Sequence, residues 1–228
     1  MKPPIYEPKG KAKEYGDLAL NIYTGCPHRC FYCFAPSVLH RDKEKFHSEV
    51  APREGIVEAT RKQLEAEKIT GKLIHLCFTC DPYPTGHDTS TTREIIKLLK
   101  EYGNHVQILT KGDGHRDFDL LDGGDWYGIT LDGSESGFKA ISMLDTLRTA
   151  ALDANTWISL EPVLDGRRAL TYIRLAKDFF VNKVKIGKLN YYKSDIDWKQ
   201  FGQEAEELCK RLGIDYYIKD SLRKEMEA

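Results

Sequence analysis

Short apolar runs alternate with longer amphipathic segments along most of this 228-residue chain, and no other feature restricts its fold as strongly. The short runs are rich in β-branched and aromatic residues, which is typical of buried strands. They cover Leu18–Tyr23, Leu73–Phe78, His105–Thr110, Trp126–Leu131, Thr156–Leu160, Lys183–Ile186 and Tyr216–Ile218. Apolar residues at helical spacing predict helices over Pro52–Glu67, Ser90–Tyr102, Phe138–Leu152, Arg167–Phe180 and Trp198–Leu212, and at most a short helical turn over Arg116–Leu121.

The repeated order of strand, helix and strand predicts parallel βαβ units with right-handed crossovers. Six such units and a final strand fall short of the eight units of a closed TIM barrel. We therefore expect an α/β fold that is a partial, open (β/α)6 TIM-type barrel with parallel strands. A doubly wound open sheet is the alternative. Polar residues follow the strands along the whole chain, which favours the barrel because strand ends converge there.

Length and composition predict one core domain over residues 1–228. Within it we expect an N-terminal arm at 1–17, a loop at 24–40 that carries three cysteines, and a C-terminal helix and strand at 188–228. The arm contains four lysines that are expected to face solvent: Lys2, Lys9, Lys11 and Lys13. The net charge of −1 argues against a large basic face but leaves room for a local phosphate-binding patch.

The sequence also bears on the compartment. No apolar run approaches the ~20 residues of a membrane span, and the polar N-terminus lacks the apolar core of a signal peptide. Six cysteines in such a chain indicate a reducing compartment and metal or thiol chemistry. We expect a cytoplasmic protein without a membrane partner.

The segment Cys26-Pro27-His28-Arg29-Cys30-Phe31-Tyr32-Cys33 places three cysteines at C-x3-C-x2-C spacing, directly after the first predicted strand. Three thiolates can hold three corners of a [4Fe–4S] cluster and leave the fourth iron without a protein ligand. An open metal position reserves a site for chemistry rather than for structure. His28, inside the loop, is expected to orient it or to be exposed.

Other arrangements of these cysteines are weaker. Zinc could be bound by Cys26, Cys30 and Cys33 with His28 or a distant ligand, but structural zinc sites use paired knuckles that this spacing fits poorly. A disulfide framework does not suit a chain long enough to bury a core without cross-links. A chance group of structural thiols remains open, although an aromatic, proline-flanked loop is an unusual place for core residues.

Polar side chains follow nearly every predicted strand. Because the carboxyl ends of parallel strands gather at one face of a barrel, these side chains are expected to share a cleft. They are Asn21, Tyr23, Thr79, Cys80, Asp81, Thr110, Lys111, Thr130, Asp132, Ser159, Glu161, Lys188, Asn190, Lys219 and Asp220.

Cys77 and Cys80 have the spacing of a C-x-x-C pair. If the strand runs to Phe78, however, residues three apart face opposite sides. We therefore expect Cys77 to be a small buried apolar group and Cys80 to lie at the strand tip, before Asp81-Pro82. Cys80 is then a candidate hydrogen-atom donor, whereas Cys209 in the last predicted helix is expected to be structural.

The cysteine spacing, with an aromatic residue before the last cysteine, resembles the radical S-adenosylmethionine (radical SAM) superfamily. A longer match resembles its spore photoproduct lyase-like group, often labelled "DNA repair photolyase". It includes residues 5–15, Leu20-Asn21-Ile22-Tyr23-Thr24-Gly25-Cys26, Asp81-Pro82-Tyr83-Pro84 with Thr92-Arg93-Glu94, Leu109-Thr110-Lys111 with Arg116-Asp117, and more loosely Glu161-Pro162.

The resemblance implies a set of site residues. Cys26, Cys30 and Cys33 would ligate a [4Fe–4S] cluster whose open iron is chelated by S-adenosyl-L-methionine (SAM). Tyr32 would pack near the adenine, while Asp81 (or its neighbours Thr79 and Cys80), Lys111 and Thr130 would hold the ribose and methionine parts. Glu161 would contact substrate or cap the next helix.

The resemblance also implies an activity. A radical SAM enzyme cleaves SAM reductively and generates a 5′-deoxyadenosyl radical that abstracts hydrogen, in a lyase-like or another radical-mediated modification. Its partners would be SAM, an external one-electron reductant of flavodoxin or ferredoxin type, and an unidentified substrate, with a nucleic-acid or nucleotide lesion among the candidates. The alternative is a non-catalytic zinc or iron–sulfur module that serves a partner protein.

Overall fold

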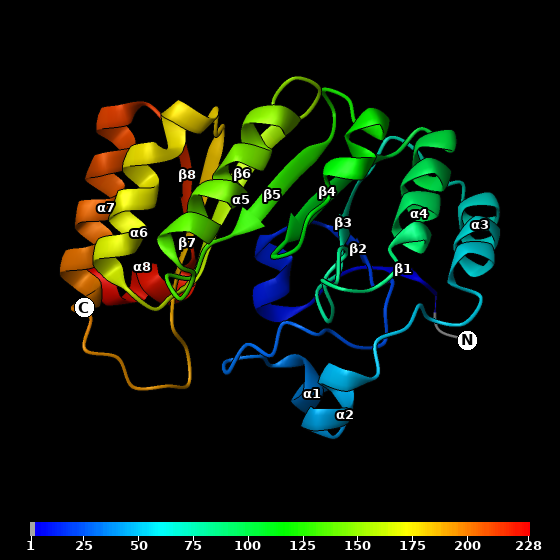
Figure 1. Ribbon diagram of the computed structural model, residues 1–228, viewed down its shortest axis with the longest axis horizontal. Helices are drawn as coiled ribbons and strands as arrows, with labels where there is room; N and C mark the ends of the chain where they lie inside the picture. Colours follow the sequence, from blue (N-terminus) through cyan, green and yellow to red (C-terminus); the bar gives the residue numbers. More distant parts are fainter. Residues whose placement is uncertain (1–2) are drawn as a thin grey trace. The chain divides into compact units, whose positions relative to one another are not determined.

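The computed structural model describes residues 3–228, and its chain divides into two compact units, Met1–Trp126 and Tyr127–Ala228 (Figure 1). Strand order equals chain order, from β1 to β8, and the strands are mostly parallel. The fold is thus the predicted α/β class, an open TIM-type arrangement. The single-domain organisation stays a prediction. No helix among the described residues is both long and apolar enough to cross a membrane.

The first unit is built on four strands: β1 (Ile5–Tyr6), β2 (Leu18–Leu20), β3 (Leu73–Leu76) and β4 (His105–Thr110). β2, β3 and β4 are parallel, with Leu20 opposite Leu76 and Leu76 opposite Ile108. Its helices are α1 (Ala35–Val38), α2 (Lys43–Ser48), α3 (Ile56–Glu67) and α4 (Ser90–Glu101), and its 3-10 segments are η1 (Gly10–Glu14) and η2 (His115–Leu120). α3 and α4 lie side by side (Figure 1).

The N-terminal arm expected at 1–17 stays a prediction, but part of it is a strand, because β1 pairs antiparallel with β2 and Ile5 is buried. Lys9, Lys11 and Lys13 are nevertheless exposed, and Lys2 lies outside the described residues. Helix α3 begins at Ile56 rather than Pro52, because Pro52 forms an isolated β-bridge with Tyr23 and the amide of Arg53 donates to Ile22 O at 2.8 Å.

The second unit contains most of β5 (Trp126–Thr130), then β6 (Asn155–Val163), β7 (Lys183–Lys188) and β8 (Asp215–Ile218). β6, β7 and β8 are parallel, with Ser159 opposite Lys185 and Lys185 opposite Tyr217. Its helices are α5 (Gly137–Ala150), α6 (Gly166–Leu175), α7 (Trp198–Leu212) and α8 (Asp220–Glu227), with η3 (Ala176–Phe179) after α6. α6 and α7 lie side by side, and α8 packs on α7 and β7 (Figure 1).

Local signals explain the helix ends in this unit. The side chain of Asp197 caps α7 by accepting from the amide of Gln200, and Gly213 ends it at a φ of 60°. The helix predicted over Arg167–Phe180 is α6 followed by η3, and Phe180 lies just beyond in the left-handed region. Helix α8 was not predicted, because a single side chain, Leu222, is its buried anchor.

Candidate functional site

The short helix α2 holds the three-cysteine loop in place through hydrogen bonds with the backbone of Cys26. The amide of Cys26 donates to Phe46 O at 3.2 Å, and His47 Nδ1 lies 2.7 Å from Cys26 O. Gly25 is required here, since a Cβ would come within 2.4 Å of Phe46 O and 2.8 Å of Glu49 O. The sequence therefore fixes the loop through a glycine that lets two backbone segments approach closely.

All three cysteines are free thiols and half-buried. Burial, followed by the Asp81 carboxylate, raises the pKa of Cys26 well above its ordinary value, although a backbone hydrogen bond from His28 opposes this. Burial also raises the pKa of Cys33, against a backbone hydrogen bond from Ala35. A thiolate in a partly buried site is stabilised by a neighbouring positive charge. Iron ions supply such a charge, so three half-buried sulfurs on one loop fit an iron–sulfur cluster.

The spacing of the sulfurs bears on zinc. Sulfurs that share one zinc ion lie about 3.8 Å apart, given Zn–S bonds of about 2.3 Å in a tetrahedron. Among the described residues, the group of three ligand atoms within 4.8 Å of one another is His105, Asp122 and Asp125, not the cysteines. In a cubane each cysteine binds a different iron, which does not require such close sulfurs. A [4Fe–4S] cluster is compatible with sulfurs that are not gathered this closely.

The group formed by His105, Asp122 and Asp125 already has a cation, Lys100, beside its carboxylates. Lys100 Nζ lies 2.5 Å from a carboxylate oxygen of Asp122 and 2.5 Å from one of Asp125, where a metal ion would otherwise sit. Lys100 is the first cause of the lowered pKa of Asp122. We treat this cluster as an ion-pair network.

Asp81, 7% exposed, joins the strand ends of the first unit. Its Oδ1 accepts from Thr110 Oγ1 at 2.5 Å and from the amide of Tyr83 at 2.8 Å, and its Oδ2 accepts from the amide of Lys111 at 2.8 Å. His28 Nδ1 lies 3.6 Å from the same Oδ2. One carboxylate thus links the ends of β3 and β4 to His28 of the cysteine loop, and the orienting role of His28 stays a prediction.

Lys111 and Tyr32, which the resemblance assigns to SAM, lie close together. Lys111 Nζ is 5.8 Å from the centre of the Tyr32 ring, within the range of a cation–π contact. Both side chains are half-buried. The structure therefore brings together a flat aromatic surface and a cation beside the cysteine loop.

The prediction that Cys77 and Cys80 face opposite sides is wrong. Strand β3 ends at Leu76, and Cys77 has a φ of 71°, which turns the chain. Both sulfurs consequently face the segment after β2: the amide of Ile22 donates to Cys77 Sγ at 3.5 Å and that of Tyr23 to Cys80 Sγ at 3.4 Å. Cys77 is buried as predicted, and burial, then a hydrogen bond with Cys80, raises its pKa.

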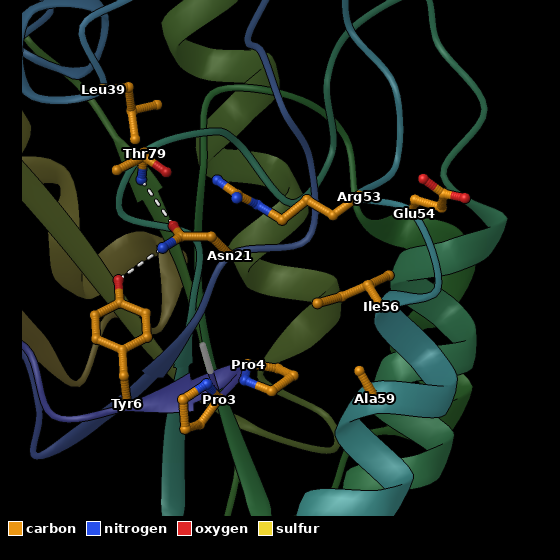
Figure 2. Close-up of a pocket in the computed structure, with 10 residues that line it drawn as sticks. All are labelled: Pro3, Pro4, Tyr6, Asn21, Leu39, Arg53, Glu54, Ile56, Ala59 and Thr79. Atoms are coloured by element: carbon orange, nitrogen blue, oxygen red, sulfur yellow. Dashed lines mark hydrogen bonds between the residues drawn. The ribbon is translucent and has the colours of Figure 1, made fainter. Parts of the chain in front are cut away.

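Thr79 is positioned by Asn21, whose Oδ1 accepts from the amides of Phe78 and Thr79 at 2.8 and 2.9 Å. Asn21 Nδ2 in turn donates to Tyr6 OH at 2.7 Å. The side chain of Thr79 lines a pocket on this side of the unit (Figure 2). The SAM contact predicted for Thr79 stays a prediction.

Other residues of the longer match have structural partners. Asp117 is fully buried, and it binds Arg93 Nη1 at 3.0 Å, Arg116 Nε at 2.8 Å and Tyr83 OH at 3.1 Å. This network joins α4 to η2. The Arg116-Asp117 pair of the longer match therefore has a structural role in this network. These contacts are not contacts with the cysteine loop.

The remaining predicted residues belong to the second unit. Thr130 ends β5 and is 9% exposed. Glu161 lies inside β6, which continues to Val163, so the prediction that it closes the strand is wrong. Its Oε2 lies 2.8 Å from Nζ of the buried Lys219. Helix α6 is capped by Asp165, which removes the helix-cap alternative for Glu161.

The sequence did not single out several side chains beside these. In the second unit, Lys185 is 7% exposed, with its Nζ 5.2 Å from the Trp157 ring and 5.9 Å from the Tyr217 ring. The available signal was a lysine inside an apolar strand. In the first unit, Arg53 and Tyr6 line the pocket with Thr79. Tyr6 was noted only within the longer match at residues 5–15, and no signal marked Arg53, because the pocket is assembled from distant segments.

Comparison with known proteins gives one result for the chain. The family model of the radical SAM superfamily matches residues 20–150, which include the cysteine loop and the ends of β2, β3 and β4. No curated protein matches the chain.

Proposed function

Because the chain belongs to the radical SAM superfamily, we propose that Cys26, Cys30 and Cys33 bind a [4Fe–4S] cluster and that their loop is the catalytic centre of a radical SAM enzyme. Enzymes of this superfamily use such a cluster with SAM and need a reductant. When bound, the cluster and SAM supply reductive cleavage of a carbon–sulfur bond and, with it, hydrogen abstraction from substrate. The protein orients these partners and keeps water away.

The observation that carries this proposal is the clamped loop with three half-buried free thiols. Gly25 and α2 hold the loop, and the Asp81–His28 contact ties it to two strand ends. A rigid loop can present three sulfurs in a fixed geometry, as cluster ligation requires.

The first unit also supports a place for SAM. We assign the adenine to the face of Tyr32 and the methionine carboxylate to Lys111, whose ammonium lies near that ring. Asp81 holds the backbone of Lys111 and thereby positions its side chain. The SAM contact predicted for Thr130, which lies in the second unit, stays a prediction.

The finer assignments are part of the same proposal. Cys80 is the candidate hydrogen-atom donor, and its sulfur is half-buried beside the amide of Tyr23. Glu161, with Lys219, is the candidate substrate contact. The spore photoproduct lyase-like grouping, a nucleic-acid or nucleotide substrate, a flavodoxin- or ferredoxin-type reductant and a cytoplasmic location rest on the sequence patterns.

Reconstitution tests the proposal. Protein loaded with iron and sulfide without oxygen is expected to bind about four irons per chain and, with reductant, to convert SAM to 5′-deoxyadenosine. Cys30→Ala should lose both properties. The matched control is Cys209→Ala, because Cys209 is a buried thiol in α7 and should be dispensable for both. Retention of iron and SAM cleavage by Cys30→Ala would overturn the assignment.

A further inference from the structure

A pocket of about 310 Å³ lies in the first unit, next to the segment that carries Cys80. Its walls come from β1, from the segment after β2, and from the approach to α3 (Figure 2). Pro4, Ile56 and Ala59 form an apolar side, and Tyr6, Asn21 and Thr79 form a polar end. This volume is at the lower limit of typical small-molecule sites, about 300–1,000 Å³.

Two polar atoms at this pocket have no partner. Arg53 Nε and Thr79 Oγ1 are buried and make no hydrogen bond in the part of the chain that the structure describes. Figure 2 shows the Arg53 side chain extending across the pocket toward Asn21 and Thr79. A buried donor without an acceptor is destabilising, so native proteins rarely keep one without a ligand or an ordered water.

Asn21 cannot supply the missing acceptor. Its Oδ1 already accepts from the amides of Phe78 and Thr79, and its Nδ2 donates to Tyr6 OH. The Tyr6 oxygen therefore accepts, and its own proton is available to donate. Burial raises the pKa of Tyr6, although the Asn21 hydrogen bond opposes this, so the phenol is a neutral donor near pH 7.

The polar end therefore contains a cation, Arg53, together with the hydroxyl groups of Tyr6 and Thr79. Arg53 forms no ion pair with any described residue, and the carboxylate among the lining residues belongs to the exposed Glu54. Figure 2 shows the Glu54 carboxylate away from the Asn21 end, beyond the Arg53 backbone. A guanidinium with neighbouring hydroxyl donors matches a phosphate or carboxylate group.

We propose that this pocket binds the anionic group of a small ligand, a phosphate or a carboxylate, through Arg53, Thr79 and Tyr6. The apolar part of that ligand lies on Pro4, Ile56 and Ala59. Lys111 and Tyr32, which are assigned to SAM, do not line this pocket, whereas Thr79, also a predicted SAM contact, does. The inference does not rest on the proposed function.

Nuclear magnetic resonance of the full-length chain provides the test. The side-chain Nε–Hε signal of Arg53, identified by its absence in Arg53→Gln, is followed while inorganic phosphate or acetate is added, with chloride as the ionic-strength control. We expect a saturable shift with phosphate or acetate and none with chloride. The anion that binds more tightly identifies a phosphate-bearing or a carboxylate-bearing ligand.

Variants assign the binding to this pocket. Because Arg53→Gln lacks the Nε–Hε group, anion binding by the variants is followed through the backbone amide signals that shift in the wild type. Arg53→Gln and Thr79→Val should each weaken anion binding, by about tenfold or more for Arg53→Gln, as expected for loss of a charged hydrogen bond. Arg61→Gln, an exposed arginine of α3 paired with Glu101 at 3.6 Å, is the control and should bind as the wild type does. If Arg53→Gln does not fold, Arg53→Lys, which also lacks an Nε–Hε group, identifies the wild-type signal, and Thr79→Val decides. A signal that does not saturate, an equal response to chloride, or equal weakening in Arg61→Gln would overturn the inference.

Discussion

Each unit holds a carboxylate near its strands, buried in the first unit and half-buried in the second, and the two carboxylates have different partners. Asp81 in the first unit accepts one hydroxyl and two backbone amides, all within 2.8 Å. Glu161 in the second unit faces the ammonium of Lys219 at 2.8 Å, packed against Gly187. In the first unit, neutral donors bind the carboxylate and fix the backbone. In the second unit, the carboxylate forms an ion pair with an ammonium group.

The difference indicates what each place is suited to do. A carboxylate that holds several loops is a scaffold, and the loops that Asp81 holds carry the cysteines and Lys111. A charge pair can exchange partners with a polar or charged substrate, because each member is a recognition group by itself. We therefore expect the first unit to depend on hydrogen bonds that fix its backbone, and the second unit to depend on the ion pair between Glu161 and Lys219.

The largest expected effect breaks the charge pair. Lys219→Met keeps a similar volume but removes the ammonium that lies 2.8 Å from the Glu161 carboxylate, which is 17% exposed. Loss of one member of a buried pair should lower the free energy of unfolding by about 3 kcal/mol at neutral pH. Urea denaturation measures this loss.

The double variant Lys219→Met with Glu161→Gln is the control, because it removes both charges. It should recover most of the lost stability. If it is as unstable as the single variant, packing rather than charge explains the effect, and the contrast between the units fails.

The second prediction concerns a neutral group of the first unit. Burial raises the pKa of Tyr23 to about 12, although its hydrogen bond with Thr92 opposes this, and its side chain is 1% exposed. A pKa raised above the unfolded value of about 10 gives stability that is complete below pH 10 and lost as the pH rises through 12. The loss should reach about 2–3 kcal/mol for this group.

The comparison of wild type with Tyr23→Phe isolates that contribution. Denaturation of the iron-free, reduced chain at pH 9 and at pH 11.5 should show a smaller decline in the variant. Thiols and other tyrosines titrate equally in both proteins. An identical decline would show that Tyr23 is not the alkaline-sensitive group and that neutral burial does not dominate this unit.

The third prediction tests the scaffold directly. Asp81→Asn retains one acceptor oxygen, so it can serve Thr110 and Tyr83 or Lys111, but not all of them. One buried amide loses its acceptor, which should lower the free energy of unfolding by about 2 kcal/mol. Reconstituted Asp81→Asn should also retain less iron, because the carboxylate faces His28 in the cysteine loop.

Asp119→Asn is the matched control for this variant. Asp119 pairs with Arg93 at 2.6 Å, but its side chain is 58% exposed, so its loss should change neither stability nor iron content appreciably. Full iron retention by Asp81→Asn would mean that Asp81 does not hold the loop.

Some of these elements could be predicted because their signals are local. α4 and α7 have the predicted starts and ends within one residue, since serine or aspartate residues and glycines mark them. The cysteine loop was predicted for the same reason, because its ligands lie within eight residues. β1 could not be predicted: two residues form a strand because Gln63, far along the chain, binds Ile5 N at 2.8 Å and Ile5 O at 2.9 Å.

The errors at the site have the same origin. The orientation of Cys77 and Cys80 depends on where β3 stops, and that is set by pairing with β2 and a backbone turn rather than by β-propensity. Arg53 was hidden in a predicted helix, whereas its amide is fixed by Ile22 O. Residues that meet only through tertiary contacts leave no periodic signal.

The smallest predicted effect comes from removing one helix N-cap in each unit, which compares the same kind of substitution in both. Asp42 caps α2 by accepting from the amide of Lys45, and Asp165 caps α6 by accepting from that of Arg168. Replacing either with alanine should lower the free energy of unfolding by about 1 kcal/mol. Only Asp42→Ala should also loosen the cysteine loop, because α2 supplies the carbonyl of Phe46 to Cys26. Iron retention during incubation with a chelator should therefore fall in Asp42→Ala and not in Asp165→Ala. Equal retention would mean that the loop keeps its shape without α2. Asp81 alone would then be the residue that holds the loop.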